Sequence, residues 1–375
     1  MSRLVLTGAR LHDGERERPE RCLVIEDGGV AAFTDETGGD AHDLGGGWLA
    51  PGLVDAQVNG GGGVMLGNGA ADAVRRIAAA HGRLGALHVL PTLVTSTPET
   101  TRAVIGEVVA ACERGVPGVA GLHLEGPHLS IAKRGAHPAH LIRPMTDADE
   151  AALLEAARRL PALLVTLAPE SVAPDRIERL AAGGVRVFLG HTDASFEDCM
   201  ACFAAGAVGA THLYNAMSGP GSRAPGLVTA ALEAGVHWGL IADGHHVHPA
   251  SIRAGLRATR APGPFLVSDA MEVAGTAADG FEWDGRCIER REGRLTLEDG
   301  TLAGADLDLP GAISTMVSRC GVGMAEAIRM ATSAPAKAVG RGDLGRLRKG
   351  DPADLVHLGD DGTLLGAWRS GAKLT

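Results

Sequence analysis

The chain has 375 residues, of which 45% are hydrophobic, and a formal net charge of −10. This size and composition predict a globular protein with a large buried core, and the acidic charge argues against a general affinity for nucleic acids or anionic membranes. Arg10 and Asp13 come too early in the chain for the apolar stretch of a signal peptide, and no later window is apolar over roughly 18 residues, as a membrane span would be. The six cysteines are scattered, as expected for reduced thiols inside a cell. We therefore expect a cytoplasmic protein.

The first part of the chain is expected to form short strands separated by glycine and aspartate turns. Apolar runs lie at residues 4–11, 22–26 and 30–33, and similar runs follow near the other end of the chain, at 355–357 and 364–368. Chain ends commonly lie close together in a domain. We therefore expect residues 1–50 and 340–375 to pair as a small β-sandwich domain beside a larger domain of residues 51–339.

The middle of the chain alternates short apolar runs with alanine-rich stretches of helical period, which is typical of repeated βα units. Helices are predicted at residues 70–84, 98–114, 174–182, 196–205 and 226–234, and strands are predicted to end near Gln57, Thr95, Glu125, Ala168, His191, His212, Ala242 and Asp269. Eight units in roughly 220 residues fit an α/β fold, the TIM-type (β/α)8 barrel of about 250 residues. An open doubly wound sheet is less favoured, because no G-x-G-x-x-G fingerprint follows the first strand.

Residues 280–300 are expected to leave this repeating pattern. The dipeptides Asp284-Gly285 and Asp299-Gly300 are typical of tight turns between antiparallel strands. We therefore predict hairpins that form an excursion after the last strand of the barrel.

Polar side chains at the strand ends are the candidates for chemistry, because barrel active sites lie where the strands end. Glu125, His191 and His212 each close an apolar run. A lone histidine at such a place is more often a hydrogen-bonding residue, but one carboxylate and two imidazoles together make an open three-ligand metal site. A metal there would lower the pKa of a bound water toward roughly 7. Asp269 follows on the eighth strand, where it could act as the general base.

The motifs of the chain, in their order, resemble those of the N-acetylglucosamine-6-phosphate deacetylases of the amidohydrolase superfamily. The resemblance covers nearly the whole chain, and the combination is highly specific. The matching stretches are Pro51-Gly52-Leu53-Val54-Asp55-Ala56-Gln57-Val58-Asn59-Gly60, His123-Leu124-Glu125-Gly126-Pro127, Lys133-Arg134-Gly135-Ala136-His137, Val165-Thr166-Leu167-Ala168-Pro169-Glu170, Gly190-His191-Thr192, Thr211-His212-Leu213-Tyr214-Asn215-Ala216-Met217, Ala242-Asp243-Gly244-His245-His246-Val247 and Leu266-Val267-Ser268-Asp269-Ala270.

The resemblance implies a role for each matching position. Glu125, His191 and His212 would bind the divalent metal, zinc or iron, and Asp269 would deprotonate the attacking water and then protonate the leaving amine. His137 would contact the sugar and polarise the acetamide carbonyl. The 6-phosphate would be bound by Arg223 and His246, although His245 and His248 flank His246 closely enough to be alternatives. The sugar site would be lined by Asn215, Ala216, Leu302, Ala303 and Gly304.

The implied reaction is hydrolysis of N-acetylglucosamine 6-phosphate to glucosamine 6-phosphate and acetate, in amino-sugar catabolism or recycling. Gln57 and Asn59 stand where many amidohydrolases carry His-x-His, and neutral amides are poor zinc ligands. We therefore expect one metal ion per subunit, with Gln57 near the metal or its water. The resemblance also implies a homodimer, in which a phosphate ligand can come from the neighbouring subunit.

Two rival functions are weighed against this one. The first is an amidohydrolase that acts on another N-acyl amino sugar or a cyclic amide. A dihydroorotase-like or amino-acid deacylase reaction would predict His-x-His and usually a bridging lysine after the fourth strand, and neither is present; the sequence leaves open whether galactosamine or other N-acyl sugars are accepted. A barrel that binds a sugar phosphate without turnover would be expected to lack a metal ligand or Asp269, and all four residues are present.

Overall fold

The computed structural model describes residues 3–36 and 41–374. Its centre is a sheet of eight parallel strands, each paired with the next in chain order. These strands are β8 (Val54–Val58), β9 (His88–Val94), β10 (Leu122–Glu125), β11 (Leu163–Leu167), β12 (Arg186–Leu189), β13 (Gly209–Ala210), β14 (His237–Leu240) and β15 (Gly263–Leu266). The predicted (β/α)8 barrel is thus confirmed, and each strand ends within three residues of its predicted end.

Contacts just beyond β15 join the last strand of the barrel to the first. The Asp269 N–H donates to the Gln57 carbonyl at 3.0 Å, and the Asn59 N–H donates to the Ala270 carbonyl at 2.8 Å. The Asp55 carboxylate, on β8, accepts hydrogen bonds from the N–H groups of Gln57 and Ser268. The seam of the barrel is therefore formed by the segments that carry Gln57 and Asp269.

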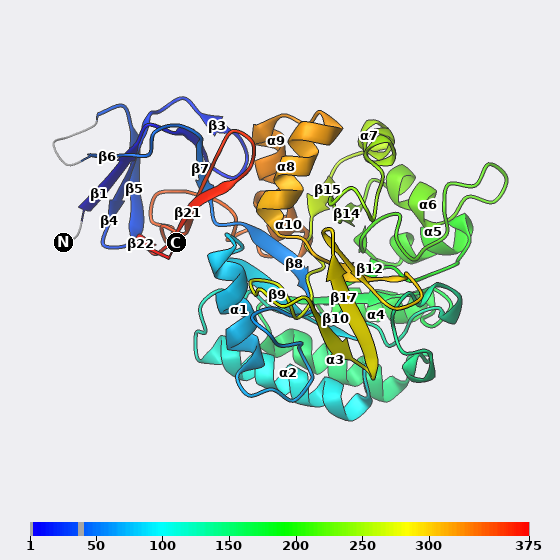
Figure 1. Ribbon diagram of the computed structural model, residues 1–375. Helices are drawn as coiled ribbons and strands as arrows, with labels where there is room; N and C mark the ends of the chain where they lie inside the picture. Colours follow the sequence, from blue (N-terminus) through cyan, green and yellow to red (C-terminus); the bar gives the residue numbers. More distant parts are fainter. Residues whose placement is uncertain (1–2, 37–40, 375) are drawn as a thin grey trace.

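Helices surround the barrel strands (Figure 1). They are α1 (Ala73–Arg83), α2 (Pro98–Glu113), α3 (Asp147–Arg159), α4 (Pro174–Ala182), α5 (Phe196–Ala204), α6 (Leu227–Ala234), α7 (Pro249–Ala258), α8 (Leu309–Cys320), α9 (Met324–Ala331) and α10 (Ser333–Ala338). The first turns of α2, α5 and α8 are capped by Thr97, Ser195 and Asp308, whose side chains each accept a backbone N–H. Each such cap contributes about 1 kcal/mol. No helix among the described residues is both long and apolar enough to cross a membrane.

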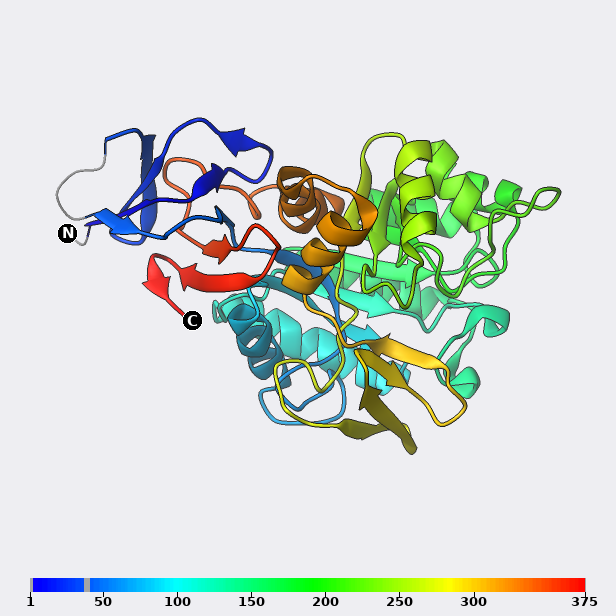
Figure 2. The same ribbon diagram turned by 45° about the horizontal axis from the view of Figure 1, so that its top comes forward.

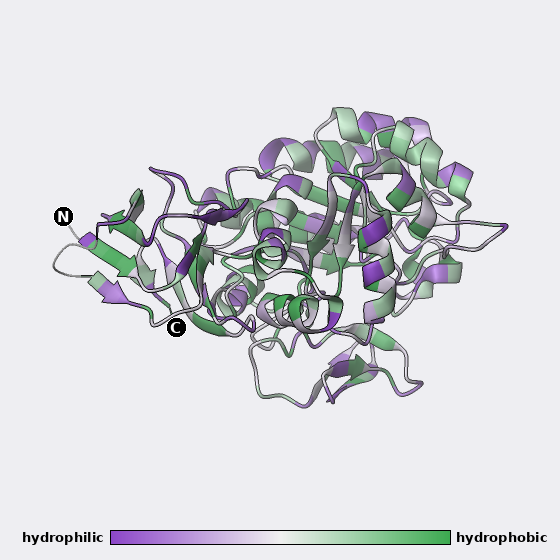
Figure 3. Ribbon diagram, turned by 90° about the horizontal axis from the view of Figure 1, so that it is seen from above, coloured by the Kyte–Doolittle hydropathy of each residue, from purple (hydrophilic) through white to green (hydrophobic). Residues whose placement is uncertain are grey.

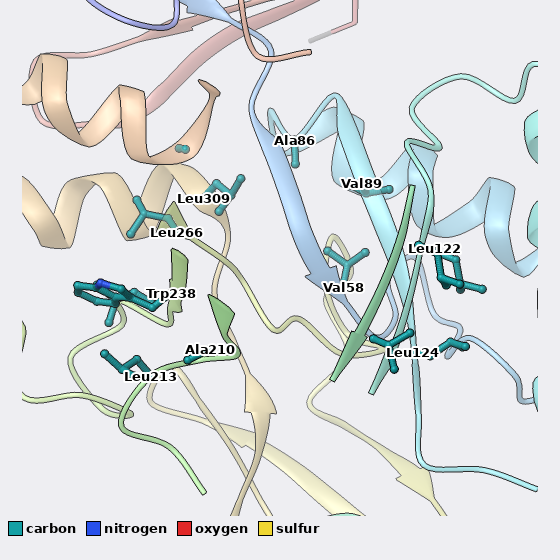
Figure 4. Packing of buried hydrophobic residues seen from close by; sticks show 14 of the residues in the cluster. Val58, Ala86, Val89, Leu122, Leu124, Ala210, Leu213, Trp238, Leu266 and Leu309 are labelled. Atoms are coloured by element: carbon teal, nitrogen blue, oxygen red, sulfur yellow. The ribbon is translucent and has the colours of Figure 1, made fainter. Parts of the chain in front are cut away.

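Two hydrophobic layers hold the barrel together. Ala56, Leu90, Leu164, Phe188 and Phe265 belong to one buried cluster, whereas a larger cluster packs strand residues against the helices. Figure 4 shows part of this larger cluster, with side chains from strands, loops and α8. Coloured by hydropathy, the central strands are largely hydrophobic and the outer helix faces carry the hydrophilic residues (Figure 3).

The two ends of the chain meet in a lobe of two β-sheets beside the barrel (Figure 1). One sheet has the order β5 (Gly29–Thr34), β4 (Cys22–Glu26), β1 (Arg3–Thr7) and β6 (Ala41–Asp43). The other has the order β22 (Ala372–Lys373), β21 (Leu364–Arg369), β20 (Leu355–Leu358), β7 (Trp48–Pro51), β2 (Arg10–His12) and β3 (Glu17–Arg18). The predicted pairing of the two ends is confirmed by β20 against β7. The proposed domain boundaries, after residues 50 and 339, remain a prediction.

One strand prediction in this lobe was wrong. Residues 4–11 form two strands, β1 and β2, which belong to different sheets. The chain breaks at Gly8, whose φ is +82°, and a Cβ there would lie 1.8 Å from Asp43 Oδ1. A residue with a side chain would be strained and crowded at this position, so glycine separates the strands.

The predicted excursion of residues 280–300 is confirmed as an antiparallel sheet of β16 (Gly280–Trp283), β17 (Arg286–Arg291), β18 (Arg294–Thr296) and β19 (Leu302–Ala305). Asp284 and Gly285 form the first turn, both with positive φ. Figure 2 shows this sheet outside the ring of helices. Met65 and Met271 pack with its buried residues and thereby attach it to the barrel.

Candidate metal centre and substrate cavity

Three candidate ligands converge at the carboxyl end of the barrel. Glu125 is the last residue of β10, and His191 and His212 each lie two residues beyond their strands, β12 and β13. The Nε2 atoms of His212 and His191 lie 2.9 and 3.3 Å from Glu125 Oε1. The three residues are buried and offer ligand atoms that all lie within 4.8 Å of one another. The structure thus brings together the carboxylate and the two imidazoles that the sequence predicted.

The protonation of His191 indicates that this cluster fits a cation. His191 Nδ1 lies 2.9 Å from the Lys133 carbonyl, which can only accept, so Nδ1 carries the proton and Nε2 is a free lone pair. His191 Nε2 lies 3.1 Å from His212 Nε2. Burial alone would raise the pKa of Glu125, but the adjacent imidazoles of His191 and His212 outweigh it and hold the pKa well below its ordinary value. One carboxylate and two imidazoles are a donor set that suits zinc or another divalent transition metal.

A second carboxylate, Asp269, lies beside this cluster. Its Oδ1 accepts hydrogen bonds from Asn59 Nδ2 at 2.7 Å and from Gln57 Nε2 at 3.0 Å. Burial and the nearby charge of Glu125 raise the pKa of Asp269 to about 6. Both amides bind the same oxygen, so among the described residues Oδ2 is left to exchange a proton.

Gln57 lies between the two carboxylates. Its Nε2 donates to Glu125 Oε1 at 3.1 Å as well as to Asp269. An amide donor therefore connects the two carboxylates at the position where many amidohydrolases carry the first histidine of His-x-His. Gln57 thus lies beside the candidate ligand Glu125, and the expectation of one metal ion remains a prediction.

His137 lies on the other side of Glu125. Its Nδ1 accepts the Thr95 N–H at 3.3 Å and lies 2.8 Å from Thr95 Oγ1, which leaves Nε2 as the protonated nitrogen. Burial lowers the pKa of His137 to about 3, so the ring is neutral at physiological pH. His137 Nε2 is 3.7 Å from Glu125 Oε2. The residue can therefore donate a hydrogen bond to an oxygen bound between it and the metal site.

These groups open into a cavity of about 410 Å³, which is in the usual range for a small-molecule site. Of the residues proposed to contact substrate, those that line the cavity are His137, Asn215, Ala216, His246, Leu302, Ala303 and Gly304. Among the three neighbouring histidines, His246 faces the cavity, while His245 and His248 are exposed.

Arg223 does not line this cavity. It is exposed in the loop between β13 and α6, which projects away from the barrel (Figure 2). The cationic groups that the cavity itself contains are Lys133 and the histidines. A contact between Arg223 and a phosphate therefore remains a prediction.

His246 is oriented by a carboxylate. Its Nδ1 donates to Asp243 Oδ2 at 2.6 Å, and the N–H groups of His245 and His246 both donate to Asp243 Oδ1 at 2.8 Å. Because Nδ1 is committed to Asp243, Nε2 is the nitrogen available to a ligand. Asp243 thus fixes the ring of His246 at the cavity wall.

Among the residues of the site that had no predicted role are Asn59, Lys133 and Trp283. Asn59 donates a hydrogen bond to Asp269, the Lys133 carbonyl accepts a hydrogen bond from His191 Nδ1, and Trp283 lines the cavity. Asn59 could have been found from its place two residues after Gln57, just beyond the end of β8, since alternate residues of an extended chain share a face. Nothing in the local sequence indicates the other two.

A barrel with an open carboxylate and imidazole site at its strand ends, beside a second carboxylate, defines a metal-dependent hydrolase. The Amidohydrolase family matches residues 48–372, and the chain belongs to this family. Within it, the chain is a deacetylase by its similarity to curated relatives. It is 41% identical to an N-acetylgalactosamine-6-phosphate deacetylase of Shewanella sp. (strain ANA-3), over 88% of this chain and 83% of that protein. It is 32% identical to the N-acetylglucosamine-6-phosphate deacetylase of Vibrio furnissii, over 96% and 92% of the two chains.

Solved structures agree with these relatives. The N-acetylglucosamine-6-phosphate deacetylase from Pasteurella multocida superimposes with a TM-score of 0.93 at 28% identity, over 100% of both chains. A mutant of the Mycobacterium smegmatis enzyme in complex with N-acetyl-D-glucosamine 6-phosphate gives a TM-score of 0.92 at 30% identity, over 100% of this chain and 99% of that one. The similarity thus includes both the barrel and the β lobe.

Proposed function

We propose that this enzyme hydrolyses N-acetyl-D-glucosamine 6-phosphate to D-glucosamine 6-phosphate and acetate, with one divalent metal ion, zinc, per subunit. The observation that carries the proposal is the meeting of Glu125, His191 and His212 with Asp269 at the strand ends. The names of the relatives and structural neighbours supply the substrate class. We also propose a cytoplasmic location and a role in amino-sugar catabolism or recycling.

The residues of the cavity divide the reaction between them. Glu125, His191 and His212 would hold the metal, which as a Lewis acid lowers the pKa of water and polarises a carbonyl. Asp269 takes a proton from the attacking water through Oδ2 and returns it to the leaving nitrogen, while Gln57 and Asn59 hold its Oδ1. The Nε2–H of His137 donates a hydrogen bond to the oxygen on which negative charge develops.

The phosphate of the substrate is assigned to His246, with Asp243 holding the ring in place. A phosphate dianion requires more positive charge than one imidazole provides. We propose that a homodimer supplies it, with Arg223 of each projecting loop entering the cavity of the other subunit. Arginine suits this contact because its planar fork binds phosphate oxygens in pairs.

The galactosamine epimer is a second candidate substrate. Two relatives, at 41% and 36% identity, are named N-acetylgalactosamine-6-phosphate deacetylases. The two sugars differ in the orientation of one hydroxyl group and share the acetamide and phosphate, so the residues assigned above would serve either one.

Acetate release from both 6-phosphates tests the proposal. The purified enzyme is assayed as isolated, after chelator treatment, and after zinc or iron is added back. We expect activity that disappears on chelation and returns with metal, with the larger kcat/KM identifying the preferred epimer. An enzyme that releases no acetate from either sugar under any metal would show that the proposed function is wrong.

A further inference from the structure

Trp283 is an aromatic side chain in the wall of the substrate cavity. It is the last residue of β16, directly before the Asp284-Gly285 turn. The chain contains only 4 tryptophans, 1 tyrosine and 6 phenylalanines, and within residues 3–36 and 41–374 Trp283 is the one of these that lines the cavity. An indole in a cavity of otherwise small, polar and aliphatic groups has no role in the chemistry assigned above.

Arg286 connects this indole to the segment that carries His137. Its guanidinium carbon lies 5.0 Å from the centre of the Trp283 ring, within the range of a cation–π contact. Its Nη2 donates to the Ala136 carbonyl at 2.7 Å. Since Ala136 directly precedes His137, one side chain holds both the indole and the backbone beside a proposed catalytic residue.

The surroundings of Trp283 make this wall of the cavity apolar. Trp283 and Ala136 pack on a cluster that includes Met271 and Ala303. Ala136, Met271 and Ala303 also line the cavity themselves. The charged and imidazole groups of the cavity are assigned to the acetamide and the phosphate. The aromatic and aliphatic wall is therefore available to contact another part of the substrate.

We infer that Trp283 packs against the pyranose ring of the substrate, and that Arg286 is a positioning residue that holds the indole and Ala136. The inference rests on the proposed function. A pyranose ring presents C–H bonds on its faces, which suit an aromatic surface. When the C4 hydroxyl is axial, as in galactosamine, the C–H bonds of one face are more continuous than in glucosamine. Trp283 therefore contributes to discrimination between the two epimers.

Steady-state kinetics of Trp283→Ala and Trp283→Phe test the contact. We expect Trp283→Ala to raise KM about tenfold, by a larger factor than it lowers kcat, and to change the kcat/KM ratio of the two epimeric substrates. Trp283→Phe keeps an aromatic surface, so its KM should be close to that of the wild type. A KM within twofold of wild type for both sugars, with an unchanged ratio, would overturn the inference.

Arg286 is tested by Arg286→Met and Arg286→Lys. Methionine keeps an unbranched side chain without the donor and should raise KM, whereas lysine keeps a donor for the Ala136 carbonyl and should restore it in part. A purely structural role would instead lower the melting temperature and the amount of active enzyme while KM stayed the same. That second result would remove Arg286 from the inference.

Tryptophan fluorescence separates this inference from the proposed function. Titration with glucosamine 6-phosphate should change the fluorescence emission of the wild type. The same change is expected in the control variant Trp368→Phe, because Trp368 lies buried in the β lobe, away from the cavity. The change should disappear in Trp283→Phe, and its persistence there would contradict the contact. A wild type that gives the fluorescence change but releases no acetate would disprove the proposed reaction and leave the contact standing.

Discussion

Three residues of the proposed reaction share an uncommon backbone conformation. His191, His212 and Asp269 have φ values of 48°, 28° and 52°, although none is glycine. Such a conformation costs on the order of 1–2 kcal/mol per residue and is typical of functional sites that the rest of the fold holds in place. At these positions the positive φ interrupts the alternating side-chain directions of a β-strand. It does so just beyond the strand, where the side chain points toward the carboxyl end of the barrel.

Replacing Asp269 with Asn tests its role in proton transfer. The variant preserves size and burial but removes the group that accepts the proton, so we expect kcat to fall by about 10²- to 10⁴-fold. Metal content, measured on the same preparation by atomic absorption, should stay near that of the wild type. Turnover within tenfold of wild type would show that another group carries the proton.

The sequence predicted those parts of the site that depend on a single strand. Glu125, His191 and His212 each end an apolar run, so their convergence follows from the barrel itself. Trp283 could not be assigned in this way, because its place in the cavity depends on how a hairpin excursion packs on Met271 and Ala303. Arg223 resembles a phosphate ligand in sequence, yet its position in a projecting loop could not be read from the local pattern.

At the scale of elements, the barrel was easier to predict than the β lobe. Each βα unit repeats a strand and a helix of strong apolar period, and α4 (Pro174–Ala182) has the predicted bounds. In the lobe, strands are short and glycines change the direction of the chain. The single strand predicted at residues 4–11 was wrong because hydrophobic pattern alone does not distinguish one strand from two that are divided at a glycine such as Gly8.

The pairing of β7 with β20 gives a prediction for two neighbouring glycines. Gly45 and Gly47 both have positive φ, but a Cβ on Gly47 would lie 2.3 Å from the Leu358 carbonyl of β20, whereas one on Gly45 meets nothing within 4 Å. We expect Gly45→Ala to lower the free energy of unfolding by about 1 kcal/mol, from backbone strain alone. Gly47→Ala should lower it by about 3 kcal/mol, because backbone must move as well.

Chemical denaturation of the two variants provides the measurement, with Gly45→Ala as the control for backbone strain. Equal losses in the two variants would show that β7 can shift away from β20 without cost. The contact between the two ends of the chain would then contribute little to the stability of the lobe.

At the scale of the whole molecule, buried histidines make stability depend on pH. His12, at the end of β2, accepts the Gly14 N–H through Nδ1. Burial lowers the pKa of His12 from 6.5 to about 4. The native state therefore binds fewer protons than the unfolded chain between these values. Its stability is fully present above pH 6.5 and decreases as the pH falls toward 4, by up to about 3 kcal/mol for this residue.

His12→Asn isolates this contribution, because an amide oxygen can accept the same N–H but does not titrate. The free energy of unfolding of both proteins is measured by denaturant titration at pH 7 and pH 5. We expect the wild type to lose more stability than the variant between the two values. Parallel losses would mean that protonation of His12 does not oppose folding.

The seam between β8 and β15 also determines when activity can arise during synthesis. Glu125, His191 and His212, the proposed metal ligands, precede residues 263–270 in the chain, so they leave the ribosome before the strand that completes the barrel. Asp269 reaches its place only when its own N–H binds the Gln57 carbonyl and completes the ring. The segment after the last strand therefore carries both the proposed proton acceptor and the contacts that complete the ring, and we expect a chain that ends before residue 263 to release no acetate.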